Sequence, residues 1–180
     1  MVAQATQFRR ARQKGQELIE FTLMVFVILG FFSLIIDISW MVFTRATLQY
    51  AVREGCRWAV ANGYDNPSIV VPNPGNIASY EQPLIQAQVV ATSMGFLNSS
   101  TPLCSGAITS TTPLCININW YAPSALNTPL SITATPPPNQ SPNVVEVDVV
   151  NFKQTPLLGI FIEKSIHTFT FNAGSADVME

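Results

Sequence analysis

The sequence predicts an α+β protein. A long N-terminal helix, half transmembrane and half amphipathic, precedes a small antiparallel β-sheet domain with a second helix. Residues 17–61 contain no proline and are rich in residues that favour helices. Three later segments alternate apolar and polar residues, as half-buried strands do. We therefore divide the chain into a head over residues 1–15, a helix over 16–61 and a body over 62–180.

The head is basic and contains no acidic residue; its cations are Arg9, Arg10, Arg12 and Lys14. A transmembrane segment is expected over about residues 18–41, because 21–36 carries no charge and ~20 apolar residues cross a bilayer. Basic clusters beside a span stay cytoplasmic, so the body should lie outside, anchored in a bacterial inner membrane. No small-x-small motif lies just beyond the apolar run. Ala59-Val60-Ala61 fits the pattern, but four charged residues precede it, which disfavours a cleaved secretory signal.

The helix is expected to continue well beyond the membrane. Residues 17–61 would measure ~68 Å as one helix, about twice what a bilayer core needs. Arg45, Gln49, Arg53 and Arg57 recur every four residues and form a polar stripe, and the apolar residues beside it can pack on the body. Asn62-Gly63 supplies the stop.

A second helix is expected from Pro83 to about Phe96, after a proline-rich linker over 62–82. Its apolar stripe is Leu84, Ala87, Ala91 and Met94, which we expect to pack in the core.

Three strands are expected over 114–121, 144–152 and 165–172. The first two should bury alternate residues: Ile116, Ile118 and Trp120 in one, and Val145, Val147 and Val149 in the other. The third should bury Phe169 and Phe171. Between the first two strands, residues 123–143 contain six prolines and must form an extended connection. Residues 154–162 are expected to form a tight turn or helical turn on the core.

The chain has three cysteines. Cys104 and Cys115 bracket a loop rich in serine and threonine, and an extracytoplasmic body permits a disulfide between them. The alternative is a pair of small buried thiols. Cys56 lies in the long helix and is expected to be a packing residue.

No catalytic constellation is evident. His167 is the single histidine, in a strand pattern with no partner group, and Glu146 and Asp148 share a strand face as solvated residues often do. The spacing of histidines and cysteines does not suit a metal, and nothing suggests a cofactor. Without the head, five basic residues face eleven acidic ones, a net charge of −6, which excludes electrostatic attraction to nucleic acid. An enzyme is therefore the least supported class.

The junction between head and span is Gly15-Gln16-Glu17-Leu18-Ile19-Glu20. This order of basic head, glycine, glutamate and apolar run resembles the leader and N-terminal helix of type IV pilin-like proteins. The resemblance implies that a prepilin peptidase cuts between Gly15 and Gln16. It also implies that Glu20, the fifth residue after the cut, meets the terminal amine of a neighbouring subunit and sets the stagger of a stack.

The physical chemistry of Glu20 supports such a partner, because a carboxylate at the edge of a membrane span is unfavourable when unpaired. The alternative is that Glu20 lies at the membrane surface beside Lys14. Asp37 follows 17 residues later, ~25 Å along the helix, and is expected at the outer interface.

Beyond the span, residues 45–57 (RATLQYAVREGCR) are similar to the corresponding segment of TadE-like pseudopilins of the tight-adherence pilus system. Residues 145–152, Thr155-Pro156-Leu157-Leu158 and the last strand also look like that family, whereas residues 62–143 carry little of the likeness. The resemblance implies a minor pilus subunit that helps to assemble, prime or cap a filament.

Its implied partners are the inner membrane, the prepilin peptidase and other pilin subunits. The alternative function is a single-pass membrane protein with an extracytoplasmic binding domain and no filament role.

Overall fold

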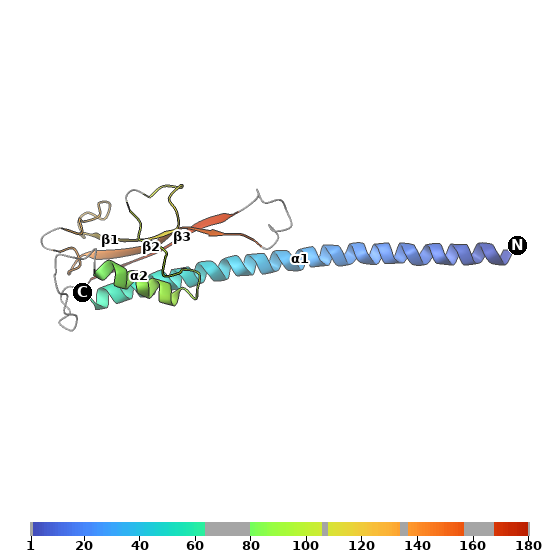
Figure 1. Ribbon diagram of the computed structural model, residues 1–180, viewed down its shortest axis with the longest axis horizontal. Coiled ribbons are helices and arrows are strands. Elements are labelled where there is room, and N and C mark those ends of the chain that lie inside the picture. The colour runs from blue at the N-terminus through green and yellow to red at the C-terminus, as the bar shows by residue number, and fades with distance from the viewer. Residues whose placement is uncertain (1, 64–79, 106–107, 134–136, 157–167, 180) are drawn as a thin grey trace. The chain divides into compact units, whose positions relative to one another are not determined.

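The computed structural model describes residues 2–63, 80–105, 108–133, 137–156 and 168–179, with side chains from Gln16 onward. Within these residues the elements are, in order, α1 (Val2–Ala61), α2 (Glu81–Thr92), β1 (Cys115–Tyr121), β2 (Val144–Gln154) and β3 (Phe169–Val178) (Figure 1). The strands form one antiparallel sheet in the order β1-β2-β3. The α+β class expected from the sequence is therefore confirmed.

The chain divides into two compact units. The first contains the N-terminal part of α1, up to Met41. The second, which we call the body, contains α1 from Val42 onward, α2 and the sheet.

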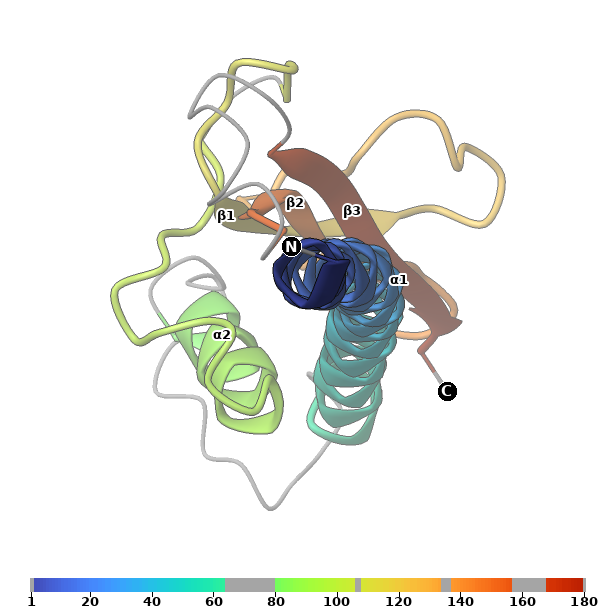
Figure 2. The same ribbon diagram turned by 90° about the vertical axis from the view of Figure 1, so that its right-hand side faces the viewer.

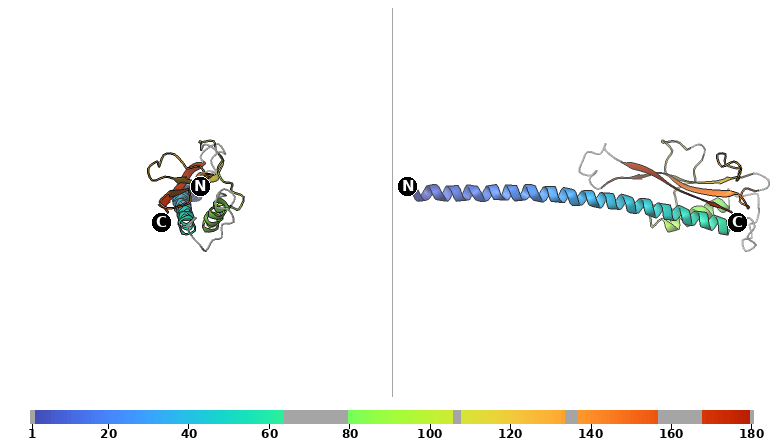
Figure 3. Two further views of the ribbon diagram at one scale, coloured as in Figure 1. Left: turned by 90° about the vertical axis from the view of Figure 1, so that its left-hand side faces the viewer. Right: turned by 180° about the vertical axis from the view of Figure 1, so that it is seen from behind.

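Helix α1 is uninterrupted from Val2 to Ala61 (Figure 3). It ends where the sequence predicts. The backbone N–H and the side-chain Nδ2 of Asn62 both donate to the carbonyl of Trp58. Its start differs, because helical backbone extends through the head instead of beginning near residue 17. The head lacks proline and contains alanine, arginine and glutamine, which favour helix, so nothing in it stops the helix before Gly15.

The core of the body lies between the helices and one face of the sheet, with α2 and the outer half of α1 on the same side (Figure 2). The predicted faces of β1 and β2 are the buried ones. The main buried apolar residues are Leu48, Ala51, Val52 and Cys56 of α1, Ile85 and Val89 of α2, Ile116, Ile118 and Trp120 of β1, and Val145, Val147 and Val149 of β2.

The predicted buried stripe of α2 is wrong. The buried residues are Glu81, Ile85 and Val89, while Leu84 and Met94 are exposed, Met94 by 71%. Apolar residues occupy so many positions of this segment that several faces are possible, and the contact of Val89 with α1 at Gly55 selects one. The helix also ends early, at Thr92, because the Ser93 hydroxyl and amide turn back to the carbonyl of Val90.

Strand β3 runs further than expected, pairing with β2 from Phe169 opposite Gln154 to Val178 opposite Val144. Phe169 is exposed, contrary to the prediction, and Phe171 is half-buried. The buried residue of β3 is Ala173. Because β2 contains a bulge between Val149 and Phe152, the alternation near its end does not continue smoothly across the sheet.

The outer edge of β1 is occupied along much of its length. Ile116 exchanges hydrogen bonds with Pro102 and Cys104, and Trp120 accepts one from Leu130. The side chain of Gln82 reaches the carbonyl of Ile118. The segment before β1, α2 and the proline-rich connection therefore share in covering this edge of the sheet.

Several predictions fall outside the described residues. They concern the linker over 64–79, the apolar turn over 157–162, and residues 165–167 with His167.

Candidate functional site

The residues of the predicted cleavage and assembly site lie on one stretch of α1. Gly15 is within the helix, and Gln16 and Glu20 follow as exposed residues one turn apart. The Gln16 Nε2 donates to Glu20 Oε1 over 3.4 Å. Positions 16 and 20 therefore share a helix face, and a cut after Gly15 would place a new amine one turn below the Glu20 carboxylate.

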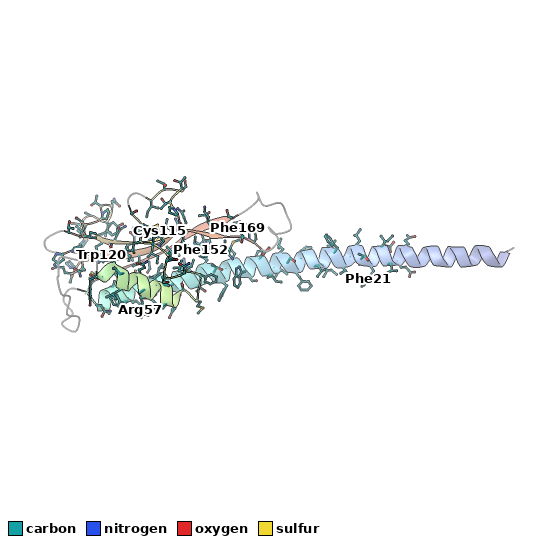
Figure 4. All side chains as sticks on the ribbon, in the orientation of Figure 1. Phe21, Arg57, Cys115, Trp120, Phe152 and Phe169 are labelled. Atoms are coloured by element: carbon teal, nitrogen blue, oxygen red, sulfur yellow. A yellow bond between two sulfur atoms is a disulfide. The ribbon has the colours of Figure 1, made fainter. Side chains whose placement is uncertain are left out.

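The helix that follows is apolar around its whole circumference and exposed. Gln16–Ala61 is long and apolar enough to cross a membrane, and none of its most apolar window is buried inside the protein. Phe21 projects outward from α1 (Figure 4), and Phe26 is 79% exposed. An apolar surface of this extent marks a membrane or protein interface. The helix is identified as a candidate membrane span by its length and composition.

The body carries a covalent link that shapes the loop before β1. Cys104 and Cys115 form a disulfide with a Cα–Cα distance of 5.1 Å across 11 residues. Asn151, in the bulge of β2 with φ 56°, donates from Nδ2 to the carbonyls of Thr109 and Thr112, both over 2.9 Å. The loop between the cysteines is thus attached to the sheet at two places.

Cys56 is a free, buried cysteine. Its Sγ donates to the carbonyl of Ser175 over 3.1 Å. Burial raises the pKa of this thiol to about 11, so it stays protonated at neutral pH. A protonated, buried thiol is a poor nucleophile, which fits a packing residue between α1 and β3.

Sequence reasoning missed a buried polar pair. Glu81, the first residue of α2, is buried, and Asn139 Nδ2 donates to its Oε2. Burial raises the pKa of Glu81 to about 7. Glu81 Oε1 and Asn139 Oδ1 make no hydrogen bond with any described residue. The two residues are 58 apart in sequence, and only the proline-rich connection brings them together.

The outer face of the sheet holds Glu146 and Asp148, the strand carboxylates noted in the sequence. Tyr121 Oη donates to Glu146 Oε2 over 2.6 Å. The pKa of Asp148 is raised to about 6, mainly by burial and then by the charge of Glu146. Over the part of the chain that the structure describes, no three histidine, cysteine or acidic side chains are grouped to hold a metal. The arrangement is a hydrogen-bonded sheet face.

The comparison with known proteins matches most of helix α1 and does not extend to α2 or the sheet. Residues 15–57 match the sequence model of the family described as TadE-like protein. No curated protein and no solved structure matches the chain. The match begins at the glycine before Gln16, includes Glu20 and the apolar span, and ends at Arg57 in the outer half of α1. Residues 15–57 are therefore similar to TadE-like proteins, and the rest of the chain lies outside the match.

Proposed function

We propose that this protein is a minor pilin-like subunit that helps to assemble, prime or cap a tight-adherence pilus. The observation that carries the proposal is the TadE-like match over residues 15–57, because it covers the predicted cleavage site, Glu20 and the span in one segment. The long exposed apolar helix supports it, since such a helix can pass from lipid to contacts with other subunits. The role is structural rather than enzymatic.

We place the basic head in the cytoplasm and the body outside, with α1 spanning the inner membrane. The cations of the head favour this orientation. A Cys104–Cys115 disulfide is compatible with an oxidising compartment, where such bonds persist. The partners are the membrane, a prepilin peptidase and the helices of other pilin subunits.

The assembly role of Glu20 follows from its surroundings. Apolar residues follow it for more than three turns, so within a bundle of helices its carboxylate would lose water. The amine created at Gln16 can offset that loss when it belongs to a neighbouring subunit. The pair then favours one axial offset between the two helices, because other offsets lose this contact between subunits.

Processing tests this proposal. Mass spectrometry of protein extracted from membranes of cells with an active prepilin peptidase should show an N-terminus at Gln16. Substitution Gly15→Leu should block the cut, because a bulky side chain disturbs the close approach of the peptidase. Gly30→Ala is the matched control: an added Cβ there meets no atom within 4 Å, and cleavage should be unchanged.

An intact Met1 or Val2 in such cells would contradict the pilin interpretation. The alternative would then be a single-pass membrane protein with an external binding domain and no filament role.

A further inference from the structure

One end of the body is strongly apolar at its surface. It is the end at which α1 joins the body, and we call it the base. Its exposed apolar side chains are Val42 and Phe43 of α1, Met94 after α2, and Phe169 at the start of β3. Val42 is 63% exposed and Phe43 is 47% exposed. Isolated apolar residues on a surface are ordinary, but several at one end of a small body call for a physical reason.

A row of aromatic rings makes the base continuous. Phe43 of α1 contacts Phe96 with ring centroids 6.0 Å apart, and Phe96 contacts Phe152 of β2 at 6.2 Å. Phe152 contacts Phe171 of β3 at 5.3 Å. Phe169 follows on the same side of β3, towards the end of the body opposite to Trp120 (Figure 4). The row of rings therefore packs α1, the turn after α2, β2 and β3 together at the base. We call this row the support.

Met94 projects from this support in an unusual backbone conformation. Its φ is 52°, and the following Gly95 has φ 86°, so both are left-handed. A left-handed conformation is unfavourable for a residue with a side chain, and exposure of a large apolar side chain is unfavourable in water. An added Cβ at Gly95 would meet no atom within 4 Å, so the turn stands clear of its surroundings. Burial of the Met94 side chain in lipid would remove the cost of its exposure and offset the cost of its backbone conformation.

The first residues of the base follow the expected span directly in sequence. The expected span ends near residue 41, and α1 continues without interruption into Val42 and Phe43. Phe43 lies two residues, ~3 Å, beyond that end. The headgroup layer of one leaflet is ~5–7 Å thick, so Phe43 is within it. Trp40, 50% exposed, is of the type enriched at this level.

The charges around the base also suit a lipid surface. Arg45 is exposed two residues after Phe43, and Lys153 is exposed next to Phe152. Long cationic side chains can extend to lipid phosphates while their stems lie along apolar surface.

We propose that the base docks into the outer headgroup layer of the membrane that anchors α1, with Met94 and Phe43 among the lipids. This docking requires that α1 spans a bilayer, but it does not depend on a pilus role. Its occupant is phospholipid, chosen because the base is continuous with the span.

The test uses the full chain in phospholipid vesicles. A cysteine introduced by Met94→Cys carries an environment-sensitive fluorophore, and lipids brominated near the headgroups serve as quencher. The control is Leu126→Cys, which is 58% exposed and follows β1 at the opposite end of the body. Unsubstituted protein measures background labelling, which should be low because Cys56 is buried.

Bromolipid should reduce the fluorescence at position 94 at least twofold and leave position 126 unchanged. Absence of quenching at 94 would overturn the docking. A blue-shifted label at 94 without quenching would also overturn it, because protein rather than lipid would then cover the base. Neither result depends on a peptidase or another pilin, so failure here differs from failure of the proposed function.

Discussion

Glu81 is an acidic residue whose burial makes the body sensitive to pH. Its pKa is raised from 4.5 to about 7 by loss of water around the carboxyl group. The unfolded chain releases this proton near pH 4.5, while the folded body holds it until about pH 7. The contribution of Glu81 is therefore most favourable below pH 4.5, is lost progressively up to about pH 7, and stays lost above it.

Substitution Glu81→Gln should remove this loss. An amide at position 81 stays neutral, and it can both accept from Asn139 Nδ2 and donate to an acceptor such as Asn139 Oδ1. Compared with wild type, the variant should be more stable at pH 8, by an amount of order 3 kcal/mol at most, and similar at pH 4.5. Asp148, whose pKa is raised to about 6, keeps some dependence in both proteins.

The measurement is thermal unfolding of the full chain in detergent at several pH values. Equal slopes of stability against pH in wild type and variant would show that Glu81 is solvated.

At the scale of elements, the contact between α1 and α2 depends on Gly55. A Cβ added there would lie 2.5 Å from Val89 Cγ2, closer than van der Waals contact allows. Gly55→Ala should therefore destabilise the body by about 1–3 kcal/mol, although alanine favours helix by ~1 kcal/mol. The matched control is Gly30→Ala, which has space around it.

Val89→Ala, combined with Gly55→Ala, should recover part of the loss because it removes the clashing methyl group. Thermal unfolding of the single and double variants decides the matter. A Gly55→Ala variant that is more stable than wild type would mean that α1 and α2 do not pack at this point.

The disulfide should stabilise the loop that leads into β1. Closing a loop of 11 residues stabilises the folded state by about 2–3 kcal/mol. The double variant Cys104→Ser with Cys115→Ser should lose this free energy of unfolding and unfold at a lower temperature. Non-reducing peptide mapping should recover Cys104 linked to Cys115 and Cys56 free. A Cys56–Cys104 link would contradict the position of α1 against the sheet.

The sequence predicts β1 and β2 better than β3 and the second helix, for a physical reason. Alternation in β1 and β2 has period two, and only one face of each strand is apolar, so the buried residues follow directly. In α2, Leu84, Ile85 and Val89 all offer apolar surface, and the face is chosen by Gly55, which is far away in sequence. The turn at Met94 depends on backbone angles that composition does not encode.

The candidate sites divide in the same way. Gly15, Gln16 and Glu20 form a linear motif, so they are visible in sequence. Asn151 and the Glu81–Asn139 pair become visible only when the fold joins distant segments.

At the scale of the whole molecule, the N-terminal part of α1 and the body belong to different units. The body has its own hydrophobic core, to which the outer half of α1 contributes. The part of α1 that belongs to the body begins at Val42. Glu20 lies more than twenty residues earlier and contributes nothing to that core. A change at Glu20 should therefore leave folding intact and act only where helices meet.

The most direct test compares the amount of Glu20→Ala protein in sheared surface filaments with the amount in membranes. The variant should be made, inserted and cut normally, since removal of the carboxylate lowers the membrane cost by up to ~2.5–3.5 kcal/mol. It should nevertheless enter filaments poorly, and Glu20→Asp should be intermediate because its charge remains but its reach is shorter. Incorporation of the alanine variant at the wild-type level would contradict the role of Glu20 in stacking.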